Sequence, residues 1–368
     1  MAGFWRRRRS MMTRLERFQK ELTARTDAAL ITSPQNQFYL SGLHYDDGYL
    51  LILADAAYLL ADFRYIEVAR READPAFTVV LVEKGMNKTV AELIGKHKAE
   101  SLLVEEAHMT LAAEARLSAA VPRISVVRGA TEILTEMRVL KDARELSAIA
   151  AAQELTDAAF SHILEYIRPD LREIDVALEL EFFMRKNGAE GLAFDTIAVS
   201  GSASSMPHGV PRDRKLEKGF LTMDFGARLG GYCSDMTRTV VIGKADDEMK
   251  RLYETVLTAQ KSALAAARGG VGCKALDAVA RDIIHGAGYV GCFGHSLGHG
   301  VGIDIHEAPR LSSAAPQADL LRPGHVVTVE PGIYLEGKYG CRIEDMIAVL
   351  PDGSIRNFTQ SPKELIEL

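Results

Sequence analysis

Residues 219–242 read GFLTMDFGARLGGYCSDMTRTVVI, and this stretch decides how the C-terminal half of the chain folds. Residues 219–225 read as an apolar strand, residues 228–231 as a turn, and residues 232–241 as the returning strand, rich in Thr and Val. With Leu229-Gly230 at the tip of the turn, Asp224 and Asp235 are predicted to lie directly opposite each other. Like charges in that position destabilise a sheet. The pattern therefore predicts a cation between the two carboxylates.

A second predicted hairpin carries two more carboxylates. Residues 326–330 (VVTVE) form an apolar strand that ends at Glu330, and the chain returns through residues 341–344 (CRIE). A period of two places Arg342 and Glu344 on one face, so an ion pair between them is an alternative interpretation of Glu344. Acidic side chains are rarely buried without a partner, and these stretches hold too few basic residues to neutralise four carboxylates. A cluster of divalent cations is the predicted partner.

Histidines gather in two glycine-containing turns. His299 lies within residues 295–302 (HSLGHGVG), where glycines let the backbone pass close to a ligand. His295 and His306 belong to the same segment, and His208 follows Pro207 in another turn. One imidazole with four carboxylates and no thiolate favours two Mn²⁺ ions, with Co²⁺ or Zn²⁺ as alternatives. Two such ions clamp the attacking and developing oxygens of a hydrolysis, which makes the chain a candidate two-metal hydrolase.

Composition narrows the class of protein further. The chain has 368 residues, a net charge of −6 and four cysteines without CxxC spacing. The charge argues against a nucleic-acid partner, and no apolar run is long enough for a membrane span. The cysteines are predicted to be reduced thiols of a cytoplasmic protein.

The periodicity of the chain indicates two domains after a disordered tail at residues 1–11. Residues 12–137 alternate helix and strand, which predicts a small α/β domain with a mixed sheet. Residues 138–368 predict an α+β domain, in which helices flank an antiparallel sheet. Its helices are expected at residues 145–167, 171–187, 247–268 and 275–287.

The five acidic and imidazole residues and their contexts resemble the pita-bread metallopeptidases, namely aminopeptidase P, prolidase and methionine aminopeptidase. The matching contexts are residues 223–226 (MDFG), 234–239 (SDMTRT), 298–302 (GHGVG), 330–332 (EPG) and 342–345 (RIED). Residues 138–146 (RVLKDAREL) resemble the start of the family's catalytic domain. The N-terminal domain resembles that of aminopeptidase P, prolidase and creatinase. Methionine aminopeptidases lack this domain, and creatinases lack the metal ligands.

The resemblance implies a pita-bread catalytic domain over residues 138–368, preceded by a creatinase-like domain over residues 12–137. It also implies a role for each metal ligand: one ion is chelated by Asp224, both ions are bridged by Asp235 and Glu344, and the shell of the other ion is completed by His299 and Glu330.

The resemblance further implies which residues act on the substrate. His208, His295 and His306 match the family's substrate-side histidines, and Arg342 matches an arginine that orients the bridging carboxylates. When an Xaa-Pro bond breaks, the proline nitrogen needs a proton, which a histidine or protonated Glu330 is placed to give.

The expected activity is that of an Xaa-Pro aminopeptidase, which removes the first residue from peptides with proline second. An Xaa-Pro dipeptidase (prolidase) is the alternative, and a non-catalytic binding protein on the same fold is a remote one. The expected partners are such peptides, with no nucleic acid and no membrane. The resemblance also implies a homodimer.

Overall fold

The computed structural model describes residues 12–368, which divide into two compact units between Arg138 and Val139. The sequence placed its domain boundary one residue earlier. The tail predicted for residues 1–11 lies outside the described residues. None of the helices from residue 12 onward is long and apolar enough to cross a membrane.

The N-terminal unit is built on one six-stranded sheet in the order β4-β3-β2-β1-β5-β6. The central strands β1, β2 and β3 pair antiparallel, while the outer pairs are parallel, so the mixed sheet expected from the sequence is present. Its elements are α1 (Arg14–Thr23), β1 (Ala28–Ile31), α2 (Pro34–Ser41), β2 (Gly48–Leu53), β3 (Ala57–Ala61), α3 (Ile66–Glu72), β4 (Thr78–Leu81), α4 (Met86–His97), β5 (Ser101–Val104), α5 (Leu111–Ala120), β6 (Ser125–Arg128) and α6 (Ala130–Arg138).

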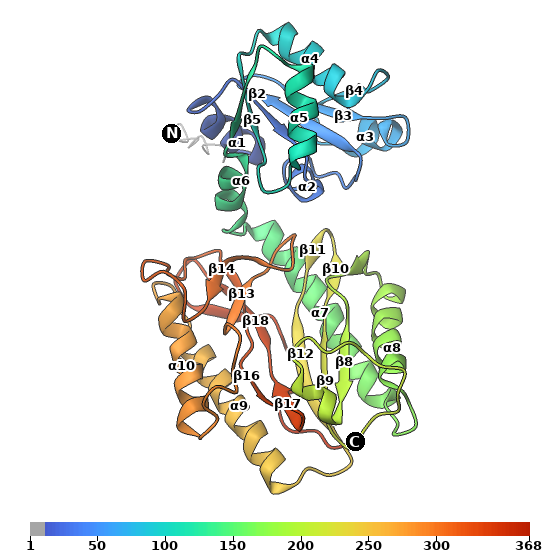
Figure 1. The fold of residues 1–368 in the computed structure, drawn as a ribbon, viewed down its shortest axis with the longest axis vertical. Coiled ribbons are helices and arrows are strands. Elements are labelled where there is room, and N and C mark those ends of the chain that lie inside the picture. Colours follow the sequence, from blue (N-terminus) through green and yellow to red (C-terminus); the bar gives the residue numbers. More distant parts are fainter. Residues whose placement is uncertain (1–11) are drawn as a thin grey trace, which may run out of the picture. The chain divides into compact units, whose positions relative to one another are not determined.

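The C-terminal unit is α+β, as the sequence predicted, and runs as two successive sets of paired helices and strands (Figure 1). The first set comprises α7 (Ala143–Tyr166), α8 (Glu173–Lys186), β7 (Gly191–Leu192), β8 (Ile197–Ser200), the 3₁₀ helix η1 (Gly201–Ser205), β9 (Gly219–Phe225), β10 (Ala227–Leu229), β11 (Tyr232–Cys233) and β12 (Met236–Ile242). The second set comprises α9 (Asp247–Ala266), α10 (Cys273–Gly286), β13 (Gly298–Gly300), β14 (Glu307–Leu311), β15 (Val326–Val329), β16 (Gly332–Leu335), β17 (Tyr339–Arg342), β18 (Asp345–Val349) and β19 (Ile355–Asn357).

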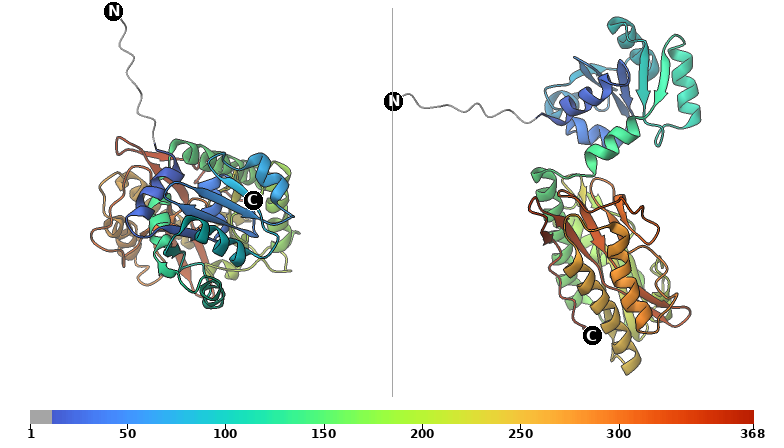
Figure 2. Two further views of the ribbon diagram at one scale, coloured as in Figure 1. Left: turned by 90° about the horizontal axis from the view of Figure 1, so that it is seen from above. Right: turned by 90° about the vertical axis from the view of Figure 1, so that its left-hand side faces the viewer.

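Each set of this unit buries its own core. In the first set, α7 and α8 pack on the sheet β12-β9-β8 through residues such as Phe160, Leu180 and Phe225. In the second set, α9 and α10 lie side by side (Figures 1 and 2) and cover apolar side chains such as Val327 and Ile347. Burying the apolar faces of these helices and strands is the main favourable contribution to folding of the unit.

The hairpin that carries Asp224 and Asp235 has a different register from the predicted one. Thr237, rather than Asp235, lies opposite Asp224 across β9 and β12, so the predicted direct opposition of the two carboxylates is wrong. The turn residues are Gly230-Gly231, with φ of 58° and 78°. A two-residue hairpin turn of this kind needs positive φ at both positions, which Leu229 would adopt only with strain. Asp235 directly precedes β12, outside the paired residues, and its side chain is buried.

The region of Glu330 and Glu344 also differs from the single hairpin predicted. Glu330 directly follows β15, as expected, but β15 pairs with β18 while β16 pairs with β17. Glu344 therefore lies in the connection between β17 and β18, not in the middle of a strand. The prediction was wrong because residues 339–349 contain no glycine or proline after Gly340, so nothing in the sequence marks the change of strand partner.

Gly226 offers a test of the close packing between the two aspartates. A Cβ at this position would lie 2.0 Å from the carbonyl oxygen of Ser234, whereas a Cβ at Gly286, near the end of α10, would have nothing within 4 Å. Gly226→Ala is expected to lower the free energy of unfolding by about 1–3 kcal/mol, the usual range for overpacking. Gly286→Ala should not lower it. Urea unfolding of both variants checks this, and an unchanged midpoint for Gly226→Ala would contradict it.

Candidate active site

One cavity of about 320 Å³ in the C-terminal unit brings together the site residues expected from the sequence. It is lined by all five expected metal ligands, the three expected substrate-side histidines and the orienting arginine: Asp224, Asp235, His299, Glu330, Glu344, His208, His295, His306 and Arg342. They come from segments that are far apart in the chain, so the two sets of helices and strands converge on this cavity.

The centre of the site is a tight group of ligand atoms. Asp235, His299 and Glu344 each offer an atom within 4.8 Å of the other two. His299 Nε2 lies 3.5 Å from Asp235 Oδ2 and 3.5 Å from Glu330 Oε1. These separations leave room for cations between the ligand atoms.

The protonation state of His299 suits metal binding. Its Nδ1 lies 3.0 Å from the carbonyl oxygen of Gly300, which can only accept a hydrogen bond. Nδ1 must therefore carry the proton, and the lone pair of Nε2 is directed toward the carboxylates. Burial lowers the pKa of His299 to about 4, so the ring stays neutral near neutral pH.

Burial also perturbs three carboxylates of the group. Burial, and then repulsion by neighbouring carboxylates, raises the pKa of both Asp235 and Glu344 well above its usual value. Burial raises the pKa of Glu330 to about 8. The direction of these shifts indicates that the side chains of the site compensate its negative charge only in part. Divalent cations would supply the missing charge.

Asp224 is held so that one of its oxygens stays available. Its Oδ2 accepts a hydrogen bond of 2.6 Å from Arg342 Nη2, while its buried Oδ1 has no hydrogen-bond partner among residues 12–368. A buried unpaired oxygen is costly, which is the condition a bound cation removes.

Arg342 therefore pairs with Asp224 and not with Glu344, so the alternative interpretation of Glu344 as its ion-pair partner is wrong. Glu344 Oε2 instead accepts a hydrogen bond of 2.7 Å from Thr237 Oγ1. The same Thr237 oxygen accepts one of 2.9 Å from Arg342 Nε. Thr237 thus connects the arginine to the glutamate.

A chain of hydrogen bonds leads from Arg342 to His295 through Tyr334, a residue that the sequence did not single out. Arg342 Nη1 donates to the Tyr334 hydroxyl at 2.7 Å, and that hydroxyl lies 2.9 Å from His295 Nε2. His295 Nδ1 lies 2.9 Å from the carbonyl oxygen of Ser296 and must donate to it, so Nε2 accepts the tyrosine proton. Burial, and then the charge of Arg342, lowers the pKa of His295 to about 4. Both ring nitrogens are engaged in a neutral ring.

The other two histidines stand at the wall of the cavity. His306 packs edge-on against His299 with ring centroids 4.4 Å apart. Its neighbour Glu307 accepts hydrogen bonds from Lys141 Nζ at 2.9 Å and from the Asp304 amide at 3.2 Å, which fixes the turn that presents His306. His208 follows Pro207, whose carbonyl oxygen accepts a hydrogen bond of 3.3 Å from Arg342.

Arg310 is a further cavity residue that the sequence did not reveal. It lies on β14, opposite His299 in the register of β13 and β14. Arginine in a strand with alternating exposure carries no signal of its own, and only the pairing of the strands places it beside the histidine. Its guanidinium puts a permanent positive charge at the wall of a strongly acidic cavity.

Comparison with known proteins identifies the class to which this site belongs. The model of metallopeptidase family M24 matches residues 147–351, and that of the creatinase/prolidase N-terminal domain matches residues 14–140. The chain therefore belongs to metallopeptidase family M24, and the resemblance seen in the sequence is confirmed.

The four cysteines are free thiols, as the sequence predicted.

Three relatives show how far the similarity extends. An Xaa-Pro dipeptidase of Pyrococcus horikoshii is 39% identical over 345 residues, which cover 92% of this chain and 94% of that protein. The structure of an Xaa-Pro dipeptidase from Bacillus anthracis matches with a TM-score of 0.91 and 38% identity, covering 96% of this chain and 99% of the other. That of an X-Pro aminopeptidase from Thermotoga maritima matches with a TM-score of 0.89 and 37% identity, covering 95% and 99%. The expected pita-bread fold is confirmed.

Substitution of Asp235 tests whether the carboxylates hold cations. Asp235→Asn removes one charge from a repelling group, so the metal-free variant should be at least as stable as the wild type. It should lose most of the rise in melting temperature that Mn²⁺ gives the wild type. An ion stabilises the folded protein only by binding to it, and the amide of the variant binds Mn²⁺ more weakly than the carboxylate does. Thermal unfolding with and without Mn²⁺ measures both effects.

Asp195→Asn is the matched control, because it removes another carboxylate from the wall of the same cavity. It should keep the Mn²⁺-induced rise. An undiminished rise in Asp235→Asn would refute the assignment of Asp235 as a metal ligand.

Proposed function

We propose that this protein is an Xaa-Pro dipeptidase that uses two divalent metal ions, with Mn²⁺ favoured. The observation that carries the metal part is the group of four carboxylates and His299, whose negative charge Arg342 compensates only in part. Asp224, Asp235, His299, Glu330 and Glu344 would hold the ions. When bound, such ions polarise a carbonyl oxygen and lower the pKa of a water molecule to near 7.

The choice of dipeptidase over aminopeptidase reverses the order of the expectations drawn from the sequence. Two of the three relatives compared are dipeptidases by name, including the one with the highest structural similarity of the three. Arg310 adds a chemical argument: an Xaa-Pro dipeptide ends in a free carboxylate, which an arginine can bind with two parallel hydrogen bonds. The similar structure of an X-Pro aminopeptidase from Thermotoga maritima keeps the aminopeptidase as a second candidate.

We infer that Glu330, rather than His295, transfers the proton. Both nitrogens of His295 are engaged, one with the Ser296 carbonyl and one with the Tyr334 hydroxyl. Glu330 Oε1 accepts a hydrogen bond of 3.2 Å from Thr328 Oγ1, and Oε2 lies 4.0 Å from His295 Nδ1. The raised pKa of Glu330 belongs to the metal-free site. With ions bound, its carboxylate would take a proton from the attacking water and give it to the leaving proline nitrogen. His295 then serves to fix Tyr334 and, through it, Arg342.

The cavity supplies the remaining requirements of an exopeptidase acting on short peptides. Its volume of about 320 Å³ suits a dipeptide. Phe194, Ile197 and Ile305 provide apolar wall on which a proline ring can pack. The cytoplasmic location and the homodimer expected from the sequence stay predictions.

The substrate preference is tested with Ala-Pro, Ala-Pro-amide and Ala-Pro-Ala in the presence of Mn²⁺. The wild type should hydrolyse Ala-Pro with a higher kcat/KM than the other two, because only Ala-Pro places a carboxylate beside Arg310. Arg310→Met should lower kcat/KM for Ala-Pro by about 30-fold, the effect of losing roughly 2 kcal/mol of hydrogen bonding between two charged groups. The same variant should act on Ala-Pro-amide almost as the wild type does.

The amide substrate is the control for general damage to the site. Equal losses of kcat/KM on Ala-Pro and Ala-Pro-amide would show that Arg310 does not bind the carboxylate of the substrate. Cleavage of Ala-Pro-Ala by the wild type, with Ala-Pro left intact, would replace the dipeptidase by the aminopeptidase.

A further inference from the structure

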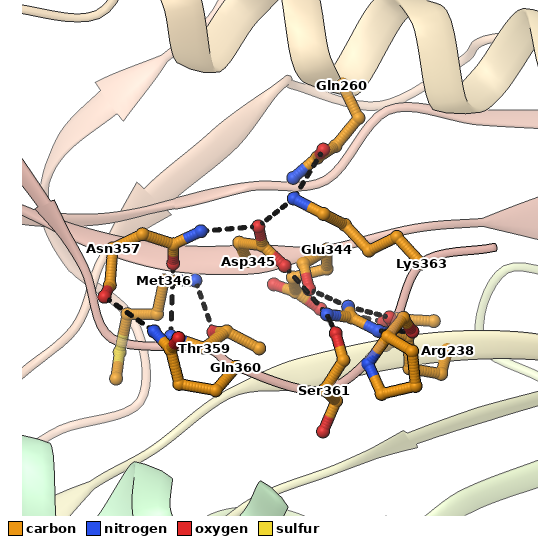
Figure 3. Close-up of polar contacts among 12 residues, drawn as sticks. Arg238, Gln260, Glu344, Asp345, Met346, Asn357, Thr359, Gln360, Ser361 and Lys363 are labelled. Atoms are coloured by element: carbon orange, nitrogen blue, oxygen red, sulfur yellow. Dashed lines mark hydrogen bonds and ion pairs between the residues drawn. The ribbon is translucent and has the colours of Figure 1, made fainter.

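Arg238 is the largest of the fully buried side chains, with its side chain 1% exposed, although its charge makes burial costly. All five of its N–H donors are used, and Figure 3 shows the guanidinium among its partners. They bind the carbonyl oxygens of Thr237, Glu344, Ser361 and Pro362 and Asp345 Oδ1. Only the planar fork of a guanidinium can serve five acceptors at once.

Two of these acceptors belong to the backbone around a metal ligand. Arg238 Nη1 donates to the carbonyl oxygens of Thr237 and Glu344. The Glu344 amide donates in turn to the Thr237 carbonyl oxygen at 3.1 Å. Glu344 lies outside the strands, so these bonds take the place of a regular ladder in holding its backbone against β12.

The other acceptors belong to residues 361–363 near the C-terminus. The carbonyl oxygens of Ser361 and Pro362 accept hydrogen bonds of 2.8 and 3.0 Å from Arg238. Lys363 Nζ donates to Asp345 Oδ2, which also accepts a hydrogen bond of 2.7 Å from Asn357 (Figure 3). Asp345 is completely buried and directly follows Glu344. Residues 361–363 are thus bonded to Arg238, which holds the backbone of Glu344, and to Asp345, the next residue after Glu344.

The same segment is anchored on two helices. The Ser361 amide donates to Asp157 Oδ1 on α7 at 2.9 Å. On α9, Tyr253 donates to the Lys363 carbonyl oxygen at 3.0 Å, and Gln260 Oε1 accepts from Lys363 Nζ at 3.3 Å. The segment therefore has a fixed position that does not depend on the metal site.

We infer that Arg238, Asp345 and Lys363 are positioning residues that transmit this fixed position to the metal ligand Glu344, so that residues 361–363 are part of the support of the metal site. The inference rests on the proposed function, because it requires that Glu344 binds a divalent ion. None of the three residues lines the cavity, so they act through the backbone and not on substrate.

Arg238→Lys and Lys363→Met test this role, with Lys244→Met as the matched control. Lys244 also forms an ion pair near the C-terminus, with Glu367 at 2.9 Å. Its side chain is 84% exposed and binds neither Arg238 nor the acceptors of Arg238. Calorimetry measures the dissociation constant for Mn²⁺. Thermal unfolding measures the melting temperature with and without Mn²⁺.

Arg238→Lys should bind Mn²⁺ about 10- to 100-fold more weakly, the usual effect of losing a group that orients a metal ligand. Lys363→Met should weaken binding about tenfold, at the lower end of that range, because Arg238 still holds Asp345. Lys244→Met should bind as the wild type does. In the first two variants the Mn²⁺-induced rise in melting temperature should shrink.

A purely structural role would lower the melting temperature of the metal-free variants and leave the dissociation constant unchanged, and that result would overturn the inference. If Arg238→Lys does not fold, the constant measured for Lys363→Met decides alone. A wild type that binds no Mn²⁺, Co²⁺ or Zn²⁺ would instead overturn the proposed function, and this inference with it.

Discussion

Mutual repulsion among buried carboxylates is the constraint on which the C-terminal unit depends. Asp224, Asp235, Glu330 and Glu344 line one cavity, and three of them have a pKa raised by burial or by each other. A protein stable enough to function tolerates such a group only if cations, hydrogen bonds and rigid backbone oppose the repulsion. Much of the polar structure around the cavity serves this purpose.

Two arginines divide that work. Arg342 reaches the site with its side chain, where it neutralises part of Asp224 and organises Thr237 and Tyr334. Arg238 stays behind the site and binds backbone carbonyl groups. Arg238 lies on β12 and Arg342 ends β17, so the two residues are far apart in the chain. One governs charge and the other governs geometry. Substitution of Arg342 should therefore change the charge of the site, whereas substitution of Arg238 should change the position of the Glu344 backbone.

The grouping of the carboxylates could be predicted from the sequence, because a carboxylate in an apolar strand is rare without a partner. They line one cavity despite two errors in the predicted strand pairing. The wrong turn at Leu229-Gly230 shifted the predicted register by two residues, which keeps each paired side chain on its face. The long periodic helices were also predictable, since their apolar faces repeat over many turns.

Tyr334, Thr237 and Arg310 could not be predicted, because their importance comes from neighbours that the fold brings to them. Tyrosine and threonine are ordinary strand residues, and only the contacts with His295 and Glu344 give them a role. Four of the five hydrogen bonds of Arg238 likewise go to residues more than a hundred positions away, which no local pattern indicates. Chemistry at single positions is readable from sequence, whereas relations between distant segments are not.

The arrangement of the ligands on separate segments has a consequence for the life of the protein in a cell. Asp224 and Asp235 belong to one set of helices and strands, while His299, Glu330 and Glu344 belong to the other. Ions held between them would cross-link two cores, and their binding energy would become part of the folding energy. Chains that lack metal would open more often and be degraded sooner. Metal supply would then set how much of this peptidase a cell keeps, as well as how fast each copy works.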